Sequence, residues 1–105
     1  MVTMESAKPL VERFQFLKDD WKRNTRHLSN VAQISLVFSY QNIIGMGPAV
    51  VPLILKELEK EPDHWFWALE AITGENPVGE NEAGDLEAPA RAWVQWGKQK
   101  GILAR

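Results

Sequence analysis

The sequence predicts an all-α fold, a compact bundle of about five helices that forms a single domain over residues 1–105. Apolar residues recur at the three- and four-residue spacing of a buried helix face in several long segments. Stretches that contain Pro or Gly separate these segments and mark helix ends. Only residues 31–38 are dense in β-branched and aromatic side chains, and no second candidate strand could pair with them.

The composition is that of a globular protein rather than of a membrane or disulfide-rich one. Of the 105 residues, 45% are hydrophobic and 25% are charged, with five Trp, four Phe, one Tyr and no Cys. The lack of cysteine excludes disulfides, thiolate nucleophiles and cysteine metal sites. No apolar run approaches the length of a bilayer span, and no signal-peptide pattern is found. We therefore expect a cytoplasmic protein without a membrane partner.

The longest predicted helix covers residues 9–28 and follows a frayed end at residues 1–7. Pro9 suits the first turn, because the N–H that proline lacks has no helical acceptor there. The apolar stripe of this helix is Leu10, Phe14, Leu17, Trp21 and Leu28.

Two shorter helical segments and a longer helix are predicted next. Residues 31–38 form a helix capped by Ser29 or Asn30, and residues 40–44 form a short helical turn. The following helix runs from residue 48 to residue 60, and its inner stripe is Val51, Ile54, Leu55 and Leu58.

The central element is a helix over residues 63–74 that is apolar around most of its circumference. We expect Asp63 to cap its first turn and Gly74 to end it in the left-handed conformation. Its buried face carries Trp65, Leu69 and Ile72. Trp67 lies about 200° around the helix from Trp65, so we expect Trp67 to be partly exposed.

An acidic loop over residues 75–84 precedes the last predicted helix. This helix begins at Asp85 as its cap, runs to Lys100 and is ended by Gly101. Its inner stripe is Leu86, Ala90, Trp93 and Gly97. Since Gly97 has no side chain, it allows another helix to approach closely.

Two resemblances extend these predictions. Residues 40–74 resemble HEAT-type repeats, through the corner and helix Gly-x-Gly-Pro-x-Val-Val-Pro-x-Ile-Leu-x-x-Leu and the helix Trp-Ala-Leu-x-x-Ile. Residues 40–101 also resemble a group of short bacterial proteins of uncharacterised function. The shared pattern is Tyr40-Gln41, Ile43-Ile44-Gly45-Met46-Gly47, the run from Asp63 to Val78, and Trp93 with Trp96-Gly97.

The first resemblance implies HEAT-like antiparallel helix pairs in the middle of the chain. The second implies a bacterial protein without catalytic activity, from chromosomal or mobile-element neighbourhoods that include toxin–antitoxin settings. It carries over no catalytic residue.

The residues themselves also predict no catalytic, cofactor or metal site. Neither His27 nor His64 is followed three or four positions later by a second His or an acid that would make a helical metal pair. The acidic loop lacks the ligand spacing of a calcium site, and Gly45-x-Gly47 lacks the strand and Lys of a phosphate loop. An enzyme would need a pocket that gathers His64 with acids of the loop. We therefore expect no enzyme and no cofactor.

The favoured function is a protein–protein interaction module or adaptor that binds another protein. Trp is enriched among the anchors of protein interfaces, and residues 63–87 hold acidic side chains but no Lys or Arg. The predicted interface is therefore an exposed aromatic residue with an acidic edge. Its residues are Trp67, His64, Glu75, Glu80 and Glu82.

The alternative function is a nucleic-acid-associated regulator, although the net charge of −2 does not favour one. It would use a basic face made by the first and last helices, which must then lie side by side. The residues of this face would be Lys18, Lys22, Arg23, Arg26, Arg91, Lys98 and Lys100.

Overall fold

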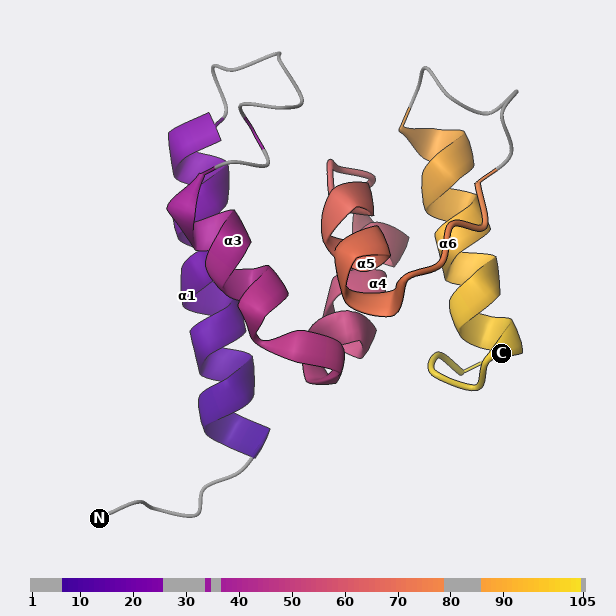
Figure 1. Ribbon diagram of the computed structural model, residues 1–105, viewed down its shortest axis with the longest axis horizontal. Coiled ribbons are helices and arrows are strands. Elements are labelled where there is room, and N and C mark those ends of the chain that lie inside the picture. Colours follow the sequence, from indigo (N-terminus) through magenta and orange to yellow (C-terminus); the bar gives the residue numbers. More distant parts are fainter. Residues whose placement is uncertain (1–6, 26–33, 35–36, 79–85, 105) are drawn as a thin grey trace.

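The computed structural model describes residues 7–25, 34, 37–78 and 86–104. All regular structure in these ranges is helical, so the predicted all-α bundle of about five helices is confirmed (Figure 1). The elements are α1 (Ala7–Thr25), α3 (Phe38–Gly45), the 3-10 turn η1 (Gly47–Val50), α4 (Val51–Lys60), α5 (Phe66–Thr73) and α6 (Glu87–Gln99).

The helices form a row in which α1 and α6 occupy opposite ends and α3, α4 and α5 lie between them (Figure 1). The most extensive contacts are those of α1 with α3, α3 with α5, and α4 with α6. Between α3 and the η1–α4 segment the chain bends by 109°. Gly47 stands in this corner with a φ of 81°, a conformation that L-residues with a side chain rarely adopt.

An aromatic cluster fills the core between α1, α3 and the start of α5. The ring of Trp21 lies 4.6 Å from that of Trp65 and 5.1 Å from that of Tyr40, measured between ring centroids. Phe14 adds a fourth ring, 5.7 Å from Trp65. All four side chains are almost completely buried, and each such burial contributes about 1.5–3 kcal/mol to folding. These rings attach α1 to the rest of the molecule.

The core at the other end is built around a close contact of α4 with α6. A Cβ atom placed on Gly97 would lie 2.7 Å from Cδ1 of Leu55 and 3.3 Å from Leu103. The prediction that Gly97 permits close approach of another helix is therefore confirmed, and that helix is α4. Trp93 is buried one turn earlier on α6.

No single helix among the described residues is long and apolar enough to cross a bilayer. The bent pair of α3 with residues 47–60 passes the same test of length and composition. Most of its large apolar side chains, among them Tyr40, Ile43, Val50 and Ile54, are fully buried in the core.

Several predicted helix ends differ from those observed. The central helix begins at Phe66 rather than at Asp63, with Trp65 at the N-cap position and no side-chain cap. The helix predicted over 31–38 does not include its last residues, because Val37 is extended and Phe38 begins α3. Its residues 31–33 and 35–36 lie outside the described part of the chain. Gly74 and Gly101 have positive φ and follow α5 and α6, as predicted.

The remaining differences concern the first and last helices. Helix α1 begins at Ala7, two residues before Pro9, so the proline still lies in the first turn. Helix α6 begins at Glu87 with Leu86 at its N-cap position. Asp85, the predicted cap, lies outside the described residues.

Candidate functional site

Helix α5 has one buried and one exposed aromatic face. Ala68 and Leu69 on the helix, with Trp65 just before it, are completely buried, whereas Trp67 keeps 51% of its surface exposed. The difference follows from helical geometry, since each residue is rotated by about 100° from the one before. The prediction that Trp67 is partly exposed is confirmed.

Trp67 forms one wall of a shallow groove between α5 and α3. The groove has a volume of about 400 Å³ and is lined by Gln41, Ile44, Trp67, Glu70 and Ala71. Glu70 and Ala71 follow Trp67 at the three- and four-residue spacing that places side chains on one helix face. Gln41 and Ile44 share a face of α3 for the same reason. The floor is mostly apolar, and among the described lining residues Glu70 is the one with an ionisable group.

Tyr40 positions α3 against α5 and thereby defines the groove. Its hydroxyl donates to the carbonyl oxygen of His64 at 2.9 Å and accepts from the backbone N–H of Ala68 at 2.9 Å. The first N–H groups of a helix have no acceptor within the helix. Tyr40 therefore caps α5 from a neighbouring helix. Burial raises the pKa of Tyr40 well above its usual range, although the Ala68 N–H partly opposes this.

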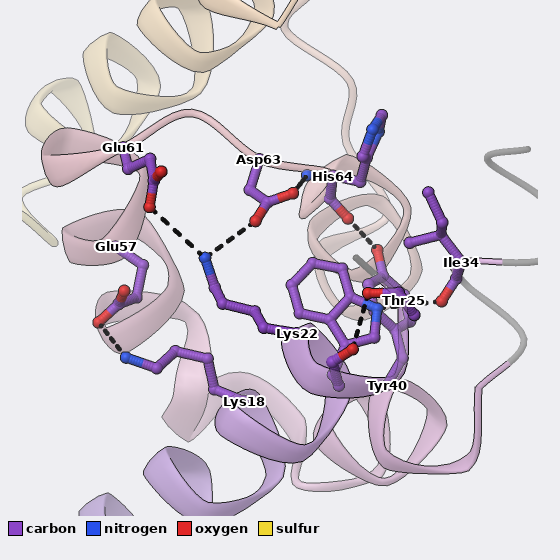
Figure 2. A network of polar contacts seen from close by, with 10 residues as sticks. Lys18, Lys22, Thr25, Ile34, Tyr40, Glu57, Glu61, Asp63 and His64 are labelled. Carbon is purple, nitrogen blue, oxygen red and sulfur yellow. Dashed lines mark hydrogen bonds and ion pairs between the residues drawn. The ribbon is translucent and has the colours of Figure 1, made fainter. Parts of the chain in front are cut away.

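Asp63 does not perform the capping predicted for it. One carboxylate oxygen accepts from the N–H of the next residue, His64, at 2.8 Å, and the other accepts from Nζ of Lys22 at 2.9 Å (Figure 2). The ion pair connects the segment before α5 to α1. A charge-assisted bond of this kind is stronger than a neutral one, so Asp63 contributes here through a partner that is distant in sequence.

Two lysines on α1 face acids of α4 and of the segment that follows it (Figure 2). Nζ of Lys18 lies 3.2 Å from Glu57, and Nζ of Lys22 lies 3.8 Å from Glu61 in addition to its contact with Asp63. Burial lowers the pKa of Lys22, but the hydrogen bond and charge of Asp63 and the charges of Glu61 and Glu57 outweigh it. The net effect is a raised pKa, which means that the folded protein stabilises the charged ammonium group.

The structure does not bring the predicted basic residues together on one face. Lys18 and Lys22 belong to α1, and Arg91, Lys98 and Lys100 belong to α6 or follow it, at the opposite end of the row (Figure 1). Several already have acidic neighbours: Arg23 has Asp20 at 3.2 Å, Arg91 has Glu87 at 3.9 Å and Lys100 has Glu75 at 3.7 Å. Arg26 lies outside the described residues.

Of the residues predicted to bind a partner, only Trp67 lines the α3–α5 groove. His64 is partly exposed, and its imidazole points away from Lys22 and Tyr40 (Figure 2). The carboxylate of Glu75 accepts from Nε1 of Trp96 at 3.1 Å and so faces α6. Glu80 and Glu82 lie outside the described residues.

The other four groove residues were missed from the sequence. The spacing from Trp67 could have identified Glu70 and Ala71, because both lie one turn further along the same helix. Gln41 and Ile44 carry no such signal, since only the packing of α3 on α5 brings them to Trp67.

A second groove of about 450 Å³ lies between α4 and α6. Its apolar residues Leu58 and Ala90 are already buried against the core. Its edge carries both signs of charge, with Glu59, Glu87, Arg91 and Lys98 among the lining residues. The lining of this groove is therefore more polar in proportion than that of the α3–α5 groove. Within the described ranges, no group of three or more His, Asp or Glu side chains could hold a metal ion.

Comparison of the chain with protein-family models, curated proteins and solved structures finds no match. The resemblance of residues 40–101 to short bacterial proteins, and of residues 40–74 to HEAT-type repeats, therefore stays a prediction.

Proposed function

We propose that this chain is a protein–protein interaction module and that its partner binds in the α3–α5 groove against Trp67. The observation that carries the proposal is the half-exposed indole of Trp67 on a helix whose other large apolar side chains lie in the core or pack against it. A Trp side chain can bury about 200 Å². Covering the exposed half would therefore contribute about 2–3 kcal/mol at ~25 cal/mol per Å².

The residues around Trp67 form a continuous surface of the kind found in protein interfaces, so Trp67 is not an isolated exposed side chain. Ile44 and Ala71 add apolar atoms to the groove, while Gln41 and Glu70 place polar groups at its sides. Phe38 is 81% exposed and lies one turn before Gln41 on α3, so the apolar surface continues along that helix. An apolar centre with a polar rim is the usual arrangement of a protein interface.

The setting proposed for this module is the bacterial cytoplasm. Its support is the resemblance of residues 40–101 to short bacterial proteins, some of them from toxin–antitoxin or mobile-element neighbourhoods. A neutralising protein of such a pair would need a surface that binds its partner and no catalytic group.

The proposal is tested by photo-crosslinking in bacterial cells. A benzoylphenylalanine in place of Ala71, which is exposed in the groove, should crosslink one partner protein. The matched control is the same replacement at Gln15, an exposed residue of α1. The crosslink at position 71 should disappear when Trp67→Ala is added and persist when Phe16→Ala is added, because Phe16 is an exposed aromatic residue outside the groove. Equal crosslinking at positions 15 and 71, or none at 71, would contradict the proposal.

A further inference from the structure

We infer that the partner segment in the α3–α5 groove is an amphipathic helix that places an apolar side chain against Trp67 and a Lys or Arg opposite Glu70. This inference rests on the proposed function and names the kind of partner that the groove fits. Three features support it: the shape of the groove, the charge of Glu70, and the repulsion between two Glu70 charges in a symmetric dimer.

The shape of the groove favours a helix over an extended strand. A strand binds by adding to the unpaired N–H and C=O groups of a sheet edge. The groove walls are instead two helices, which present rows of side chains rather than the edge of a sheet. Side chains of a third helix can pack between the rows of side chains on α3 and α5.

The size of the groove sets how much of a helix it can hold. Helices α3 and α5 have eight residues each, which corresponds to a length of about 12 Å. Two turns of a partner helix cover that length. The partner's apolar contacts should therefore come from positions i and i+3 or i+4, as in other complexes of a helix with a groove.

Glu70 determines the charge of the partner. Glu57, Glu61, Glu75 and Glu87 each lie within 4.0 Å of a Lys or Arg nitrogen. In the described part of the chain, Glu70 has no such contact, although it is exposed at the side of the groove next to Trp67. None of the described residues that line this groove is a Lys or Arg. A basic residue on the partner would therefore meet a carboxylate that pairs with no cation of the described residues.

The same charge disfavours a second copy of this chain as the partner. A twofold symmetric contact through the groove places the same surface of both copies at the axis. Both Glu70 carboxylates would then enter the same largely apolar interface, and the described lining offers no Lys or Arg to pair with them. Like charges brought together in this way oppose association, so the partner is a different protein.

The test selects binders from two libraries displayed on the same protein scaffold, one randomised on a helix surface and the other in an extended loop. The full chain is the target. Binders that also bind the Trp67→Ala variant are removed by counter-selection. We expect the helix library to yield the remaining binders, with apolar residues at i and i+3 or i+4 and an adjacent Lys or Arg. Trp67→Ala should weaken these binders by about thirtyfold or more.

Charge reversal at Glu70 tests the position of the basic residue. Glu70→Lys should weaken the selected binders by about two- to fivefold, the range of an exposed ion pair. A selection repeated on Glu70→Lys should replace the Lys or Arg by Asp or Glu. The matched control is Glu59→Lys, at an exposed acid of the other groove, which should leave binding unchanged.

The results separate failure of the inference from failure of the proposed function. Loop-library binders that need Trp67, binders indifferent to the charge at position 70, or association of the chain with itself through Trp67 would each overturn the inference. So would a natural partner whose segment crosslinked to position 71 is not helical. Each of these results except self-association is still compatible with the proposed function, in which another protein binds in the groove. The proposed function fails on its own if position 71 crosslinks no partner. If Trp67→Ala does not fold, that result counts against Trp67 as the central residue of the interface, and Trp67→Phe replaces it in the binding measurements.

Discussion

At the scale of single residues, the hydroxyl of Tyr40 is the polar atom on which the α3–α5 groove depends. It bridges the carbonyl of His64 and the N–H of Ala68, two backbone groups on either side of the first turn of α5. Without the Tyr40 hydroxyl, this carbonyl and this N–H would each lose a hydrogen bond in or near the core. A cap supplied by another helix couples the start of α5 to the position of α3.

Tyr40→Phe should therefore destabilise the protein by about 1–3 kcal/mol, the cost of leaving buried polar groups unpaired. The ring remains in the aromatic cluster, so the change isolates the hydroxyl. Urea unfolding followed by tryptophan fluorescence measures the effect. Thr73→Val is the control, because the Thr73 hydroxyl bonds only near the end of its own helix. Equal effects of the two substitutions would show that Tyr40 does not hold α5.

Gly97 illustrates the opposite requirement, the absence of a side chain. Gly97→Ala adds a Cβ 2.7 Å from Leu55 Cδ1 in a buried contact. We expect a loss of about 1–3 kcal/mol from overpacking, although alanine has the higher helix propensity. Gly45→Ala is the matched control. Gly45 is also helical, and its added Cβ would meet nothing within 4 Å.

Thermal unfolding compares the two glycine variants. Gly45→Ala should be neutral or stabilising by up to about 1 kcal/mol. Leu55→Val should cost less in the Gly97→Ala protein than in the wild type, because it shortens the side chain that the new methyl group meets. A stabilising Gly97→Ala would mean that α4 and α6 are further apart than described.

At the scale of secondary-structure elements, α5 serves both the core and the proposed interface. Different sides of this short helix serve the two roles. Leu69 lies on the buried side and Trp67 on the exposed side. The contact of α5 with α3 places Gln41 and Ile44 beside Trp67. Binding can therefore be altered at Trp67 without loss of the core.

Two alanine substitutions in this helix should have different effects on stability. Leu69→Ala should reduce the free energy of unfolding by about 2–5 kcal/mol, since it removes a completely buried side chain. Trp67→Ala should cost clearly less, about 1–2 kcal/mol, since only about half of that side chain is buried. Chemical denaturation of both variants provides the measurement. If Trp67→Ala unfolds the protein, Trp67 belongs to the core and the proposed interface loses its central residue.

At the scale of the whole molecule, helices distant in sequence are joined by contacts that depend on protonation. Lys22 connects α1 to the segment before α5, and Tyr40 connects α3 to α5. The folded state raises the pKa of both groups above their values in the unfolded chain. Both therefore favour the protonated form in the folded protein.

Stability should consequently be lost at alkaline pH. Below the unfolded pKa values of about 10, both groups are protonated in either state and their contribution is fully present. As the pH rises above that value, the unfolded chain releases the two protons first, which favours unfolding. Tyr40 is the only tyrosine, so the near-ultraviolet absorbance of tyrosinate reports on it alone.

Tyrosinate should form together with the loss of native tryptophan fluorescence, at a pH well above the usual pKa of tyrosine. In Tyr40→Phe the loss of stability with rising pH should be less steep, because only Lys22 remains. Titration of Tyr40 near its usual pKa in a protein with native fluorescence would show that its hydroxyl is not held as described.

The sequence by itself determined the features that depend on a few neighbouring residues. The structure confirms three such predictions: the all-α fold, the ends of α5 and α6 at Gly74 and Gly101, and the exposure of Trp67. The reason is that helical rotation and the conformational range of glycine act locally. The close approach at Gly97 was predicted in the same way, but not the identity of α4 as the helix that approaches.

Only the tertiary structure decided which apolar faces meet. Several helices carry similar stripes, and periodicity does not state which stripe packs on which. The choice of Tyr40 over Asp63 as the cap of α5, and of Lys22 as the partner of Asp63, depends on residues more than 20 positions apart. The groove at Trp67 arises from that arrangement. The same packing places α1 and α6 apart, because α3, α4 and α5 bury their faces between them (Figure 1).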